Sequence, residues 1–453
     1  MTRAGQDTAR RVLVVVYLGA HWRSLLPTAQ FLAESGHAVH VLFARPYPGW
    51  EADAAQAAQH GFEAADAAGR TVTPGMQPLS KKQRNQCRLS ARSVLRAGFK
   101  LRAYAAQVRD FLMRMRPAAI FLPEENLEYL SHVLTREAAR LGVPSLVLPY
   151  TLDNPLEACE AYHGHPRHQV RGFFRRWFIQ KHPHWAREHR GTALLRLPFR
   201  AALAMQWFGF APPDPWQNTC SFASHVLLES EAARRAYASS GIPDEKFAII
   251  GSAVHDRMAV ILSCEADNRA GLLQELGLDP KRPVFLAAIP PDQFNTGRSG
   301  GEFAAHREIV AFWLETLAAT GWSVVVNLHP HLKPEKIDFG AWPNVKHCSR
   351  PTAEVIPLCD VFVASISATI RWAVACGKTV INHDLYLYRY DDYKGAPGVL
   401  HLETKADFAA EVARIARQVP QAVPHAEWGI LDGKSGERLL SLLSTLISSR
   451  THT

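Results

Sequence analysis

The sequence predicts an α/β protein of two Rossmann-like, doubly wound domains facing a cleft. Continuous β-branched runs such as 11–17 (RVLVVVY) and 322–328 (WSVVVNL) are typical of strands buried on both faces of a parallel sheet. These runs alternate with helical stretches in two separate series along the chain. A length of 453 residues allows two or three domains, and only two sheet-forming series are found.

The first series begins with the strand 11–17. A loop leads to a helix over 25–35, which Gly36 ends, and then to a strand at 37–43. This order predicts a right-handed βαβ crossover. The first loop has one glycine and lacks the GxGxxG pattern, so a nicotinamide or flavin enzyme is rejected. Further strands are predicted at 118–123, 144–149, 224–228 and 246–251.

The second series starts after residue 265. Its strands are predicted at 283–289, 322–328, 360–364 and 379–382, with helices over 303–320, 354–359 and 367–376. We therefore expect an N-terminal domain over 1–265 and a C-terminal domain over 266–453, the latter including a C-terminal helix.

Positive charge is concentrated in two segments. Lys and Arg number 51 against 42 Asp and Glu, a net charge of +9 that suits an anionic partner. Basic helices are predicted within 80–116, and an insertion at about 162–216 mixes Arg with Phe and Trp. Such an insertion suits an anionic bilayer surface, and equally a helix pair that packs its rings on the domain. No recognised nucleic-acid module is present, so we expect no nucleic-acid partner.

Neither a membrane span nor a metal centre is expected. No segment reaches the roughly 18 apolar residues of a spanning helix, so membrane contact would be peripheral, on the inner face of the cytoplasmic membrane. Seven scattered cysteines encode neither a disulfide framework nor a zinc site, which favours a reducing cytoplasm. The histidines of the insertion have no metal-ligand spacing; they are His163, His165, His168, His182 and His184.

Polar residues follow two strands of the second series. His329 and Pro330 come directly after the strand 322–328, while Ser365, Ser367 and Thr369 follow the strand 360–364. Ligands of such sheets bind at the carboxyl ends of the strands, and a helix start with hydroxyls suits a phosphate. A strand-end histidine and plain helix N-caps are the alternative explanations.

At this point the sequence resembles a family. The runs SVVVNLHPH and AEVIPLCDVFVASISATIRWAVACGKTVINHD resemble the C-terminal half of GT-B glycosyltransferases, particularly bacterial capsule and surface-polysaccharide (lipopolysaccharide) transferases with an HP motif and a serine motif. The segment 246–258 (KFAIIGSAVHDRM) is similar to a strand and turn of GT-B enzymes and nucleotide-sugar 2-epimerases. The resemblance covers about the last half of the chain.

The resemblance implies a donor site in the C-terminal domain. His329 and Pro330 would contact the nucleotide or its phosphate, Ser365 and Ser367 would bind phosphate, and Thr369 belongs to the same motif. The Gly-rich loop 295–301, with Arg298 and Gly300, would wrap these phosphates, or it is a surface turn. No cofactor or metal is implied, because GT-B enzymes stabilise the leaving phosphate with helix dipoles and cations.

A transferase also needs a general base for the acceptor hydroxyl. Glu124 and Glu125 follow a predicted strand of the first series and are the first choice, with His21 as the runner-up. A helix cap for Glu125 and a loop histidine for His21 are the alternatives.

Three functions remain open. The first is an inverting, metal-independent glycosyltransferase that moves a sugar from a CMP-, UDP- or GDP-linked donor to a surface polysaccharide or lipid-linked glycan. The second is a nucleotide-sugar 2-epimerase, which needs acid and base residues on both faces of one sugar ring. The third is a non-catalytic nucleotide-sugar-binding or scaffold protein.

Overall fold

A computed structural model describes residues 10–66, 93–150, 155–294, 300–330, 332–421 and 423–450 of the chain. Its contacts form two compact units. The first unit holds Met1–Leu228, Tyr237–Ala248 and Gly436–Thr453, and the second holds Glu229–Ala236 and Ile249–Ser435.

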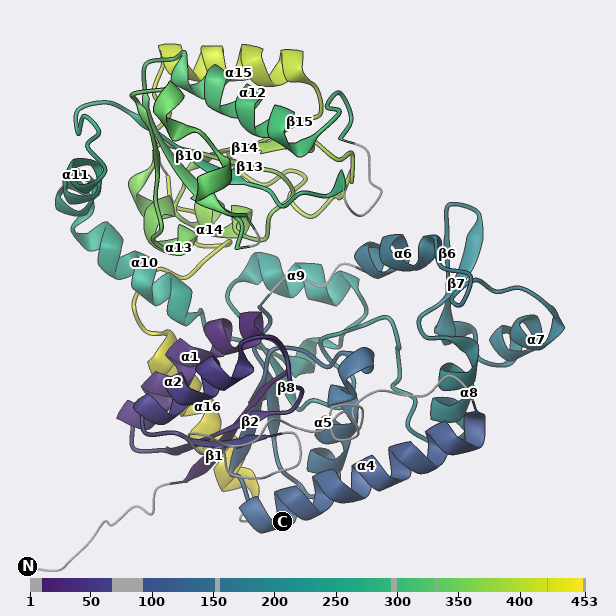
Figure 1. Cartoon of the computed structure of the whole chain (residues 1–453). Helices are drawn as coiled ribbons and strands as arrows, with labels where there is room; N and C mark the ends of the chain where they lie inside the picture. Colours follow the sequence, from purple (N-terminus) through teal and green to yellow (C-terminus); the bar gives the residue numbers. More distant parts are fainter. Residues whose placement is uncertain are drawn as a thin grey trace, which may run out of the picture. The chain divides into compact units, whose positions relative to one another are not determined.

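The first unit is built on a seven-stranded sheet of order β3-β2-β1-β4-β5-β8-β9 (Figure 1). Each pairing from β3 through to β8 is parallel. Its strands are β1 (Arg11–Val16), β2 (Ala38–Phe43), β3 (Glu63–Asp66), β4 (Ala119–Leu122), β5 (Ser145–Val147), β8 (His225–Leu228) and β9 (Phe247–Ile249). The order reverses beside β1, which makes the gap between β1 and β4 the topological switch point.

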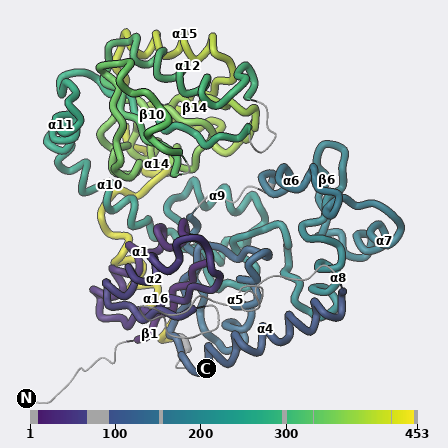
Figure 2. Tube along the Cα trace, viewed as in Figure 1, coloured from purple at the N-terminus to yellow at the C-terminus, as the bar shows by residue number. Residues whose placement is uncertain are grey.

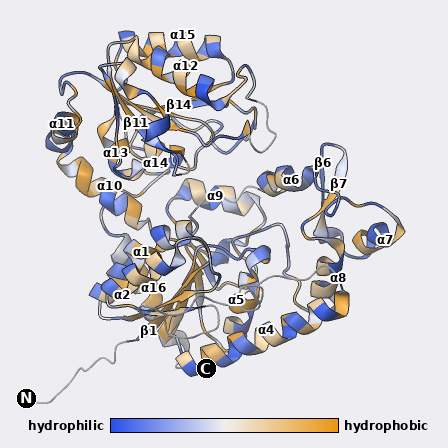
Figure 3. Ribbon diagram, viewed as in Figure 1, coloured by the Kyte–Doolittle hydropathy of each residue, from blue (hydrophilic) through white to orange (hydrophobic). Residues whose placement is uncertain are grey.

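Helices cover the first sheet. They are α1 (Gly19–Glu34), α2 (Trp50–Gln59), α4 (Val94–Met115), α5 (Ser131–Arg140) and α16 (Ser435–Arg450). The helix α9 (Glu231–Ser239) is divided between the units, with its residues up to Ala236 in the second unit and the rest in the first. One core cluster packs Leu112 of α4 and Leu134 of α5 against Leu13 and Val15 of β1. Figure 3 shows these strands in the hydrophobic colour, as expected for strands buried on both faces.

The predicted insertion forms a small subdomain between β5 and β8 (Figure 2). It consists of α6 (Pro155–His163), α7 (Phe173–Lys181), the antiparallel hairpin β6 (Ala186–His189) and β7 (Thr192–Leu195), and α8 (Phe199–Trp207). Phe178 and Trp185 pack in its core, whereas Phe173 and Phe174 are 76% and 73% exposed. The expected packing of rings on the domain is therefore confirmed for Phe178 and Trp185, and contact of the insertion with a bilayer stays a prediction.

The second unit has a parallel six-stranded sheet of order β12-β11-β10-β13-β14-β15. Its strands are β10 (Val284–Ile289), β11 (Ser323–Leu328), β12 (Val345–His347), β13 (Val361–Ala364), β14 (Thr379–His383) and β15 (Val399–Leu402). Its helices are α10 (Ala253–Ser263), α11 (Glu265–Glu275), α12 (His306–Ala318), α13 (Thr352–Val355), α14 (Ile370–Ala375) and α15 (Lys405–Arg417). The switch point lies between β10 and β13.

The division into units differs from the expected one. The chain first enters the second unit at Glu229, returns for Tyr237–Ala248, and crosses again at Ile249, well before residue 265. The C-terminal helix α16 belongs to the first unit from Gly436 onward, where that glycine lies against the ring of Phe31 in α1. The basic helices expected over 80–116 correspond to α4, and residues 80–92 lie outside the described residues.

Candidate functional site

Two predicted bases form a pair at the switch point of the first sheet. His21 lies in the first turn of α1, directly after β1, and Glu124 lies two residues after β4. Because β1 and β4 are parallel neighbours, their carboxyl ends meet at one edge of the sheet. His21 Nε2 is 3.3 Å from Glu124 Oε1, and both side chains are buried.

A hydrogen bond to the other ring nitrogen of His21, Nδ1, fixes the tautomer of the neutral ring. The backbone N–H of Tyr17 donates to His21 Nδ1 at 3.4 Å, so Nδ1 is an acceptor and the neutral ring carries its proton on Nε2. The contact of Nε2 with Glu124 Oε1 does not have the geometry of a hydrogen bond, and neither atom has a hydrogen-bond partner among the described residues. Both buried atoms are therefore available to a ligand, and Glu124 is the group of the pair that can accept a proton from one.

Aromatic rings surround this pair. Tyr150 lies edge-on to His21 at a centroid distance of 4.8 Å, and Tyr129 stacks on Tyr17 at 5.6 Å. The guanidinium carbon of Arg45 lies 4.8 Å from the ring centroid of Tyr129. The group formed by Tyr17, His21, Glu124, Tyr129 and Tyr150 is called the first-sheet site below.

Tyr129 and Tyr150 of the first-sheet site remain protonated at neutral pH. Burial raises the pKa of both Tyr129 and Tyr150, and the nearby charge of Glu124 raises each further. Their hydroxyls are therefore hydrogen-bond donors and acceptors rather than anions. This combination of one carboxylate, neutral phenols and aromatic faces suits a ligand rich in hydroxyls.

Glu125 does not belong to the first-sheet site, because its carboxylate is bonded to the loop before β8. Its carboxylate accepts hydrogen bonds from the backbone N–H groups of Phe222 at 3.0 Å and Ala223 at 3.1 Å, from the N–H of Ser221, and from the hydroxyl of Thr135. Both oxygens are therefore engaged. Although burial raises the pKa of Glu125, these donors oppose that effect. Glu125 fastens the loop before β8, and this removes it from the candidates for the base.

In the second unit, the predicted donor-binding residues lie at the carboxyl edge of its sheet. His329 and Pro330 follow β11, and Ser365 follows β13. The two strands flank β10, so their ends are about 10 Å apart at the usual strand spacing. His329 is half-buried and its N–H donates to the carbonyl of Ile289 at the end of β10, whereas Pro330 is exposed.

The serine motif is a turn rather than the first turn of a longer helix. The helix expected from Ser367 begins at Ile370 and has six residues, and Thr369 makes no side-chain cap. Ser367 Oγ accepts from the N–H of Thr369 at 3.3 Å and lies 2.8 Å from its hydroxyl. Ser365 Oγ is buried and has no hydrogen-bond partner among the described residues. An inward hydroxyl of this kind is available to a ligand oxygen.

The turn is strained, and Asn382 holds it. Ile366 has φ of 42°, a left-handed conformation that is uncommon for a β-branched residue. Its N–H donates to Asn382 Oδ1 at 2.9 Å, and Asn382 Nδ2 lies 3.2 Å from His401 Nδ1. Strain of this kind persists where surrounding contacts fix a functional loop.

The Gly-rich loop is only partly described. Arg298 lies outside the described residues. Gly300 forms an antiparallel bridge with Phe303, and a Cβ at Gly300 would lie 2.3 Å from the ring of Phe294. The lack of a side chain at Gly300 is therefore explained by close packing of Phe294.

Sequence reasoning missed three residues of these sites. Tyr129 and Tyr150 were not singled out, although Tyr150 follows soon after the carboxyl end of β5, where ligands bind. Asn382 is a polar residue inside a buried strand, which is itself a signal because such a group needs a hydrogen-bond partner.

The described residues hold neither a candidate metal cluster nor a candidate membrane span. No group of three or more His, Cys, Asp or Glu side chains is placed to hold a metal ion in the described part of the chain. Within the same residues, no helix is both long and apolar enough to cross a membrane.

Comparisons with known proteins bear on the fold. No family model matches the chain, and no curated protein matches it. The structure of UDP-GlcNAc 2-epimerase from Neisseria meningitidis bound to UDP-GlcNAc is similar with a TM-score of 0.54 and 13% identity, over 96% of this chain and 100% of that chain. A putative UDP-N-acetylglucosamine 2-epimerase from Listeria monocytogenes gives 0.53 and 10%, over 96% of each chain.

A transferase also matches, more weakly. The glycotransferase of kitacinnamycin gives a TM-score of 0.49 at 15% identity, over 98% of this chain and 96% of that chain. At such identities the epimerase similarities establish the fold alone. The expected pair of Rossmann-like domains, shared by GT-B enzymes and 2-epimerases, is confirmed.

Proposed function

We propose that this protein is an inverting glycosyltransferase that takes a sugar from a nucleotide-sugar donor and uses no metal. The observation that carries the proposal is the pair of His21 and Glu124, buried at the switch point of the first sheet and surrounded by tyrosines. A buried carboxylate with an imidazole beside it suits a general base, and aromatic faces with phenol groups suit a sugar acceptor.

In the proposed reaction, Glu124 removes the proton of an acceptor hydroxyl. The hydroxyl oxygen forms a bond to the anomeric carbon of the donor sugar. The bond from that carbon to the phosphate oxygen breaks, and the nucleotide leaves with the electron pair. Attack from the face opposite to the leaving nucleotide inverts the configuration at the anomeric carbon.

The second sheet supports the donor half of the proposal. His329 and the turn 365–369 lie at the carboxyl edge where Rossmann-like sheets bind nucleotides. The buried hydroxyl of Ser365 is suited to a phosphate oxygen of the donor, which would be a CMP-, UDP- or GDP-sugar. The acceptor would be a surface polysaccharide or a lipid-linked glycan.

Glu124→Gln tests the proposed base. We expect transfer to fall by about 10²- to 10⁴-fold, the usual contribution of a general base, with nucleotide binding unchanged. The measurement is nucleotide release in the presence of acceptor glycans, with wild type, Glu124→Gln and the exposed control Glu34→Gln compared. Full activity of Glu124→Gln would refute the assignment.

A 2-epimerase is the second candidate, because the similar structures with TM-scores of 0.54 and 0.53 are those of a UDP-GlcNAc 2-epimerase and of a putative one. Incubation of the protein with nucleotide-sugar donors, with and without acceptor glycans, distinguishes the transferase from the epimerase. A transferase releases nucleotide only when an acceptor is present, while an epimerase isomerises the donor sugar without one. Binding without either product would favour the non-catalytic scaffold. A thermal-shift screen with CMP, UDP, GDP and CDP identifies the nucleotide, because a ligand of the folded state raises its apparent stability.

A further inference from the structure

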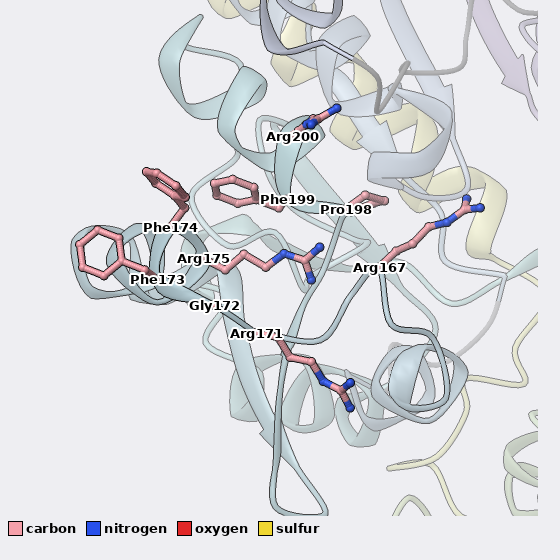
Figure 4. A pocket seen from close by; sticks show the side chains of 9 residues that line it. All are labelled: Arg167, Arg171, Gly172, Phe173, Phe174, Arg175, Pro198, Phe199 and Arg200. Atoms are coloured by element: carbon pink, nitrogen blue, oxygen red, sulfur yellow. The ribbon is translucent and has the colours of Figure 1, made fainter.

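A pocket of about 500 Å³ opens in the insertion of the first unit (Figure 4). Its lining combines cations and rings and includes no acidic residue. The cations are Arg167, Arg171, Arg175 and Arg200. In Figure 4, Phe173 and Phe174 lie at one end and Arg167 at the other, with the guanidinium of Arg175 pointing between them.

Part of the positive charge of this pocket is not neutralised by carboxylates of the described residues. Among the described residues, neither Arg167 nor Arg171 forms an ion pair, and both are exposed. Arg175 donates to the carbonyl oxygens of Gln169 at 2.5 Å and Pro166 at 3.1 Å, which fixes its guanidinium, and no carboxylate of the described residues pairs with it.

The start of α7 adds to this field. The helix begins at Phe173, beside the pocket, and its N-cap Gly172 provides no side-chain acceptor. Its first turn contains no acidic residue. The partial positive charge of a helix N-terminus therefore adds to the guanidinium groups of Arg167, Arg171 and Arg175, and all of them favour an anion with phosphate-like oxygens.

The other half of the lining is apolar and exposed. Phe173 and Phe174 are 76% and 73% exposed, and Trp177, one turn further along α7, is 41% exposed. Residues three and four positions apart lie on one helix face, so these rings form a continuous apolar surface beside the arginines. A soluble polyanion would engage the arginines and leave these rings in water.

We propose that this pocket binds the phosphate headgroups of anionic phospholipids, and that Phe173 and Phe174 enter the adjoining interface of the bilayer. Guanidinium groups meet phosphate while the aromatic rings leave water, the two contributions that hold an interfacial helix on an anionic membrane. The chain would thereby dock peripherally, through the insertion. The inference does not depend on the identity of the reaction that the enzyme performs.

Flotation with vesicles tests the proposal. We expect the full-length protein to float with vesicles of equal parts phosphatidylglycerol and phosphatidylcholine, and to stay behind with phosphatidylcholine alone. The double variant Arg167→Gln and Arg171→Gln should bind at least tenfold more weakly, since each basic residue near an anionic surface contributes roughly fivefold. The double variant Phe173→Ser and Phe174→Ser should bind the anionic vesicles much more weakly. Its residual binding should still fall as the salt concentration rises, because the arginines are intact.

Matched controls separate the pocket from bulk charge and apolarity. Arg114→Gln with Arg417→Gln removes two exposed arginines that lie outside the pocket, and Val260→Ser with Val423→Ser removes two exposed apolar side chains. Both controls should bind as wild type does. Circular dichroism and the melting temperature establish that each variant folds.

Three results would overturn the proposal. The first is failure of wild type to float with the anionic vesicles. The second is equal binding by the pocket variants and the controls. The third is retention of a soluble polyphosphate by the four arginines while vesicles are not bound, which would assign the pocket to a soluble polyanion.

Discussion

At the scale of single residues, two buried imidazoles make stability depend on pH. Burial lowers the pKa of His132 to about 3 and that of His383 to about 4, against about 6.5 in an unfolded chain. The unfolded state therefore binds more protons below pH 6.5. Stability that is present above pH 6.5 is lost as the pH falls toward these folded-state values, by about 2 kcal/mol per imidazole at pH 5.

His132→Leu should reduce this dependence on pH. Leucine cannot take up a proton in the unfolded state, so the urea midpoint of the variant should fall less steeply between pH 6.5 and pH 5 than that of wild type. The exposed His165→Leu is the control and should keep the wild-type slope. Identical slopes for wild type and His132→Leu would contradict the argument.

At the scale of elements, the turn between β13 and α14 depends on a side chain from the next strand. Asn382→Ala removes the acceptor of the Ile366 N–H, which costs about 1–3 kcal/mol for a buried unsatisfied donor. The strained turn should relax and Ser365 should shift. We expect nucleotide affinity to fall roughly tenfold, equivalent to about 1.4 kcal/mol, measured by calorimetry with the nucleotide that binds.

Asn382→Asp is the matched variant for Asn382→Ala, because it separates loss of the acceptor from loss of the donor. The carboxylate keeps an acceptor for the Ile366 N–H and loses the donor that faces His401. It should therefore retain more affinity than Asn382→Ala. If both variants lose stability and neither loses affinity, the turn does not bind the nucleotide and the proposed donor site is wrong.

At the scale of the whole molecule, the two sheets were predictable because buried parallel strands appear as continuous apolar runs. The edge strands β3 (EAAD) and β12 (VKH) have no such run, since an edge is less enclosed, and they were missed. His21 and Glu124 were predicted only as rival bases. Their pairing depends on β1 lying beside β4, and the backbone N–H groups that bond to Glu125 come from residues nearly 100 positions away.

The position of the C-terminal helix also depends on contacts that the local sequence does not reveal. An amphipathic helix has one sequence pattern whichever sheet it covers, so α16 was expected in the second unit and packs in the first. Ser435 still belongs to the second unit, where its N–H donates to the carboxylate of Asp256 at 3.1 Å. The change of unit occurs at Gly436, where a Cβ would lie 2.3 Å from the ring of Phe31.

Gly436→Val tests this placement. Added methyl groups should collide with Phe31 and destabilise the first unit by about 1–3 kcal/mol, the usual cost of overpacking. Phe31→Ala in the same chain should relieve much of that loss, whereas the two changes would be additive if the helix packed elsewhere. Limited proteolysis should show faster cleavage in the first unit, with nucleotide affinity unchanged. A loss of nucleotide affinity without new cleavage in the first unit would instead place α16 with the second sheet.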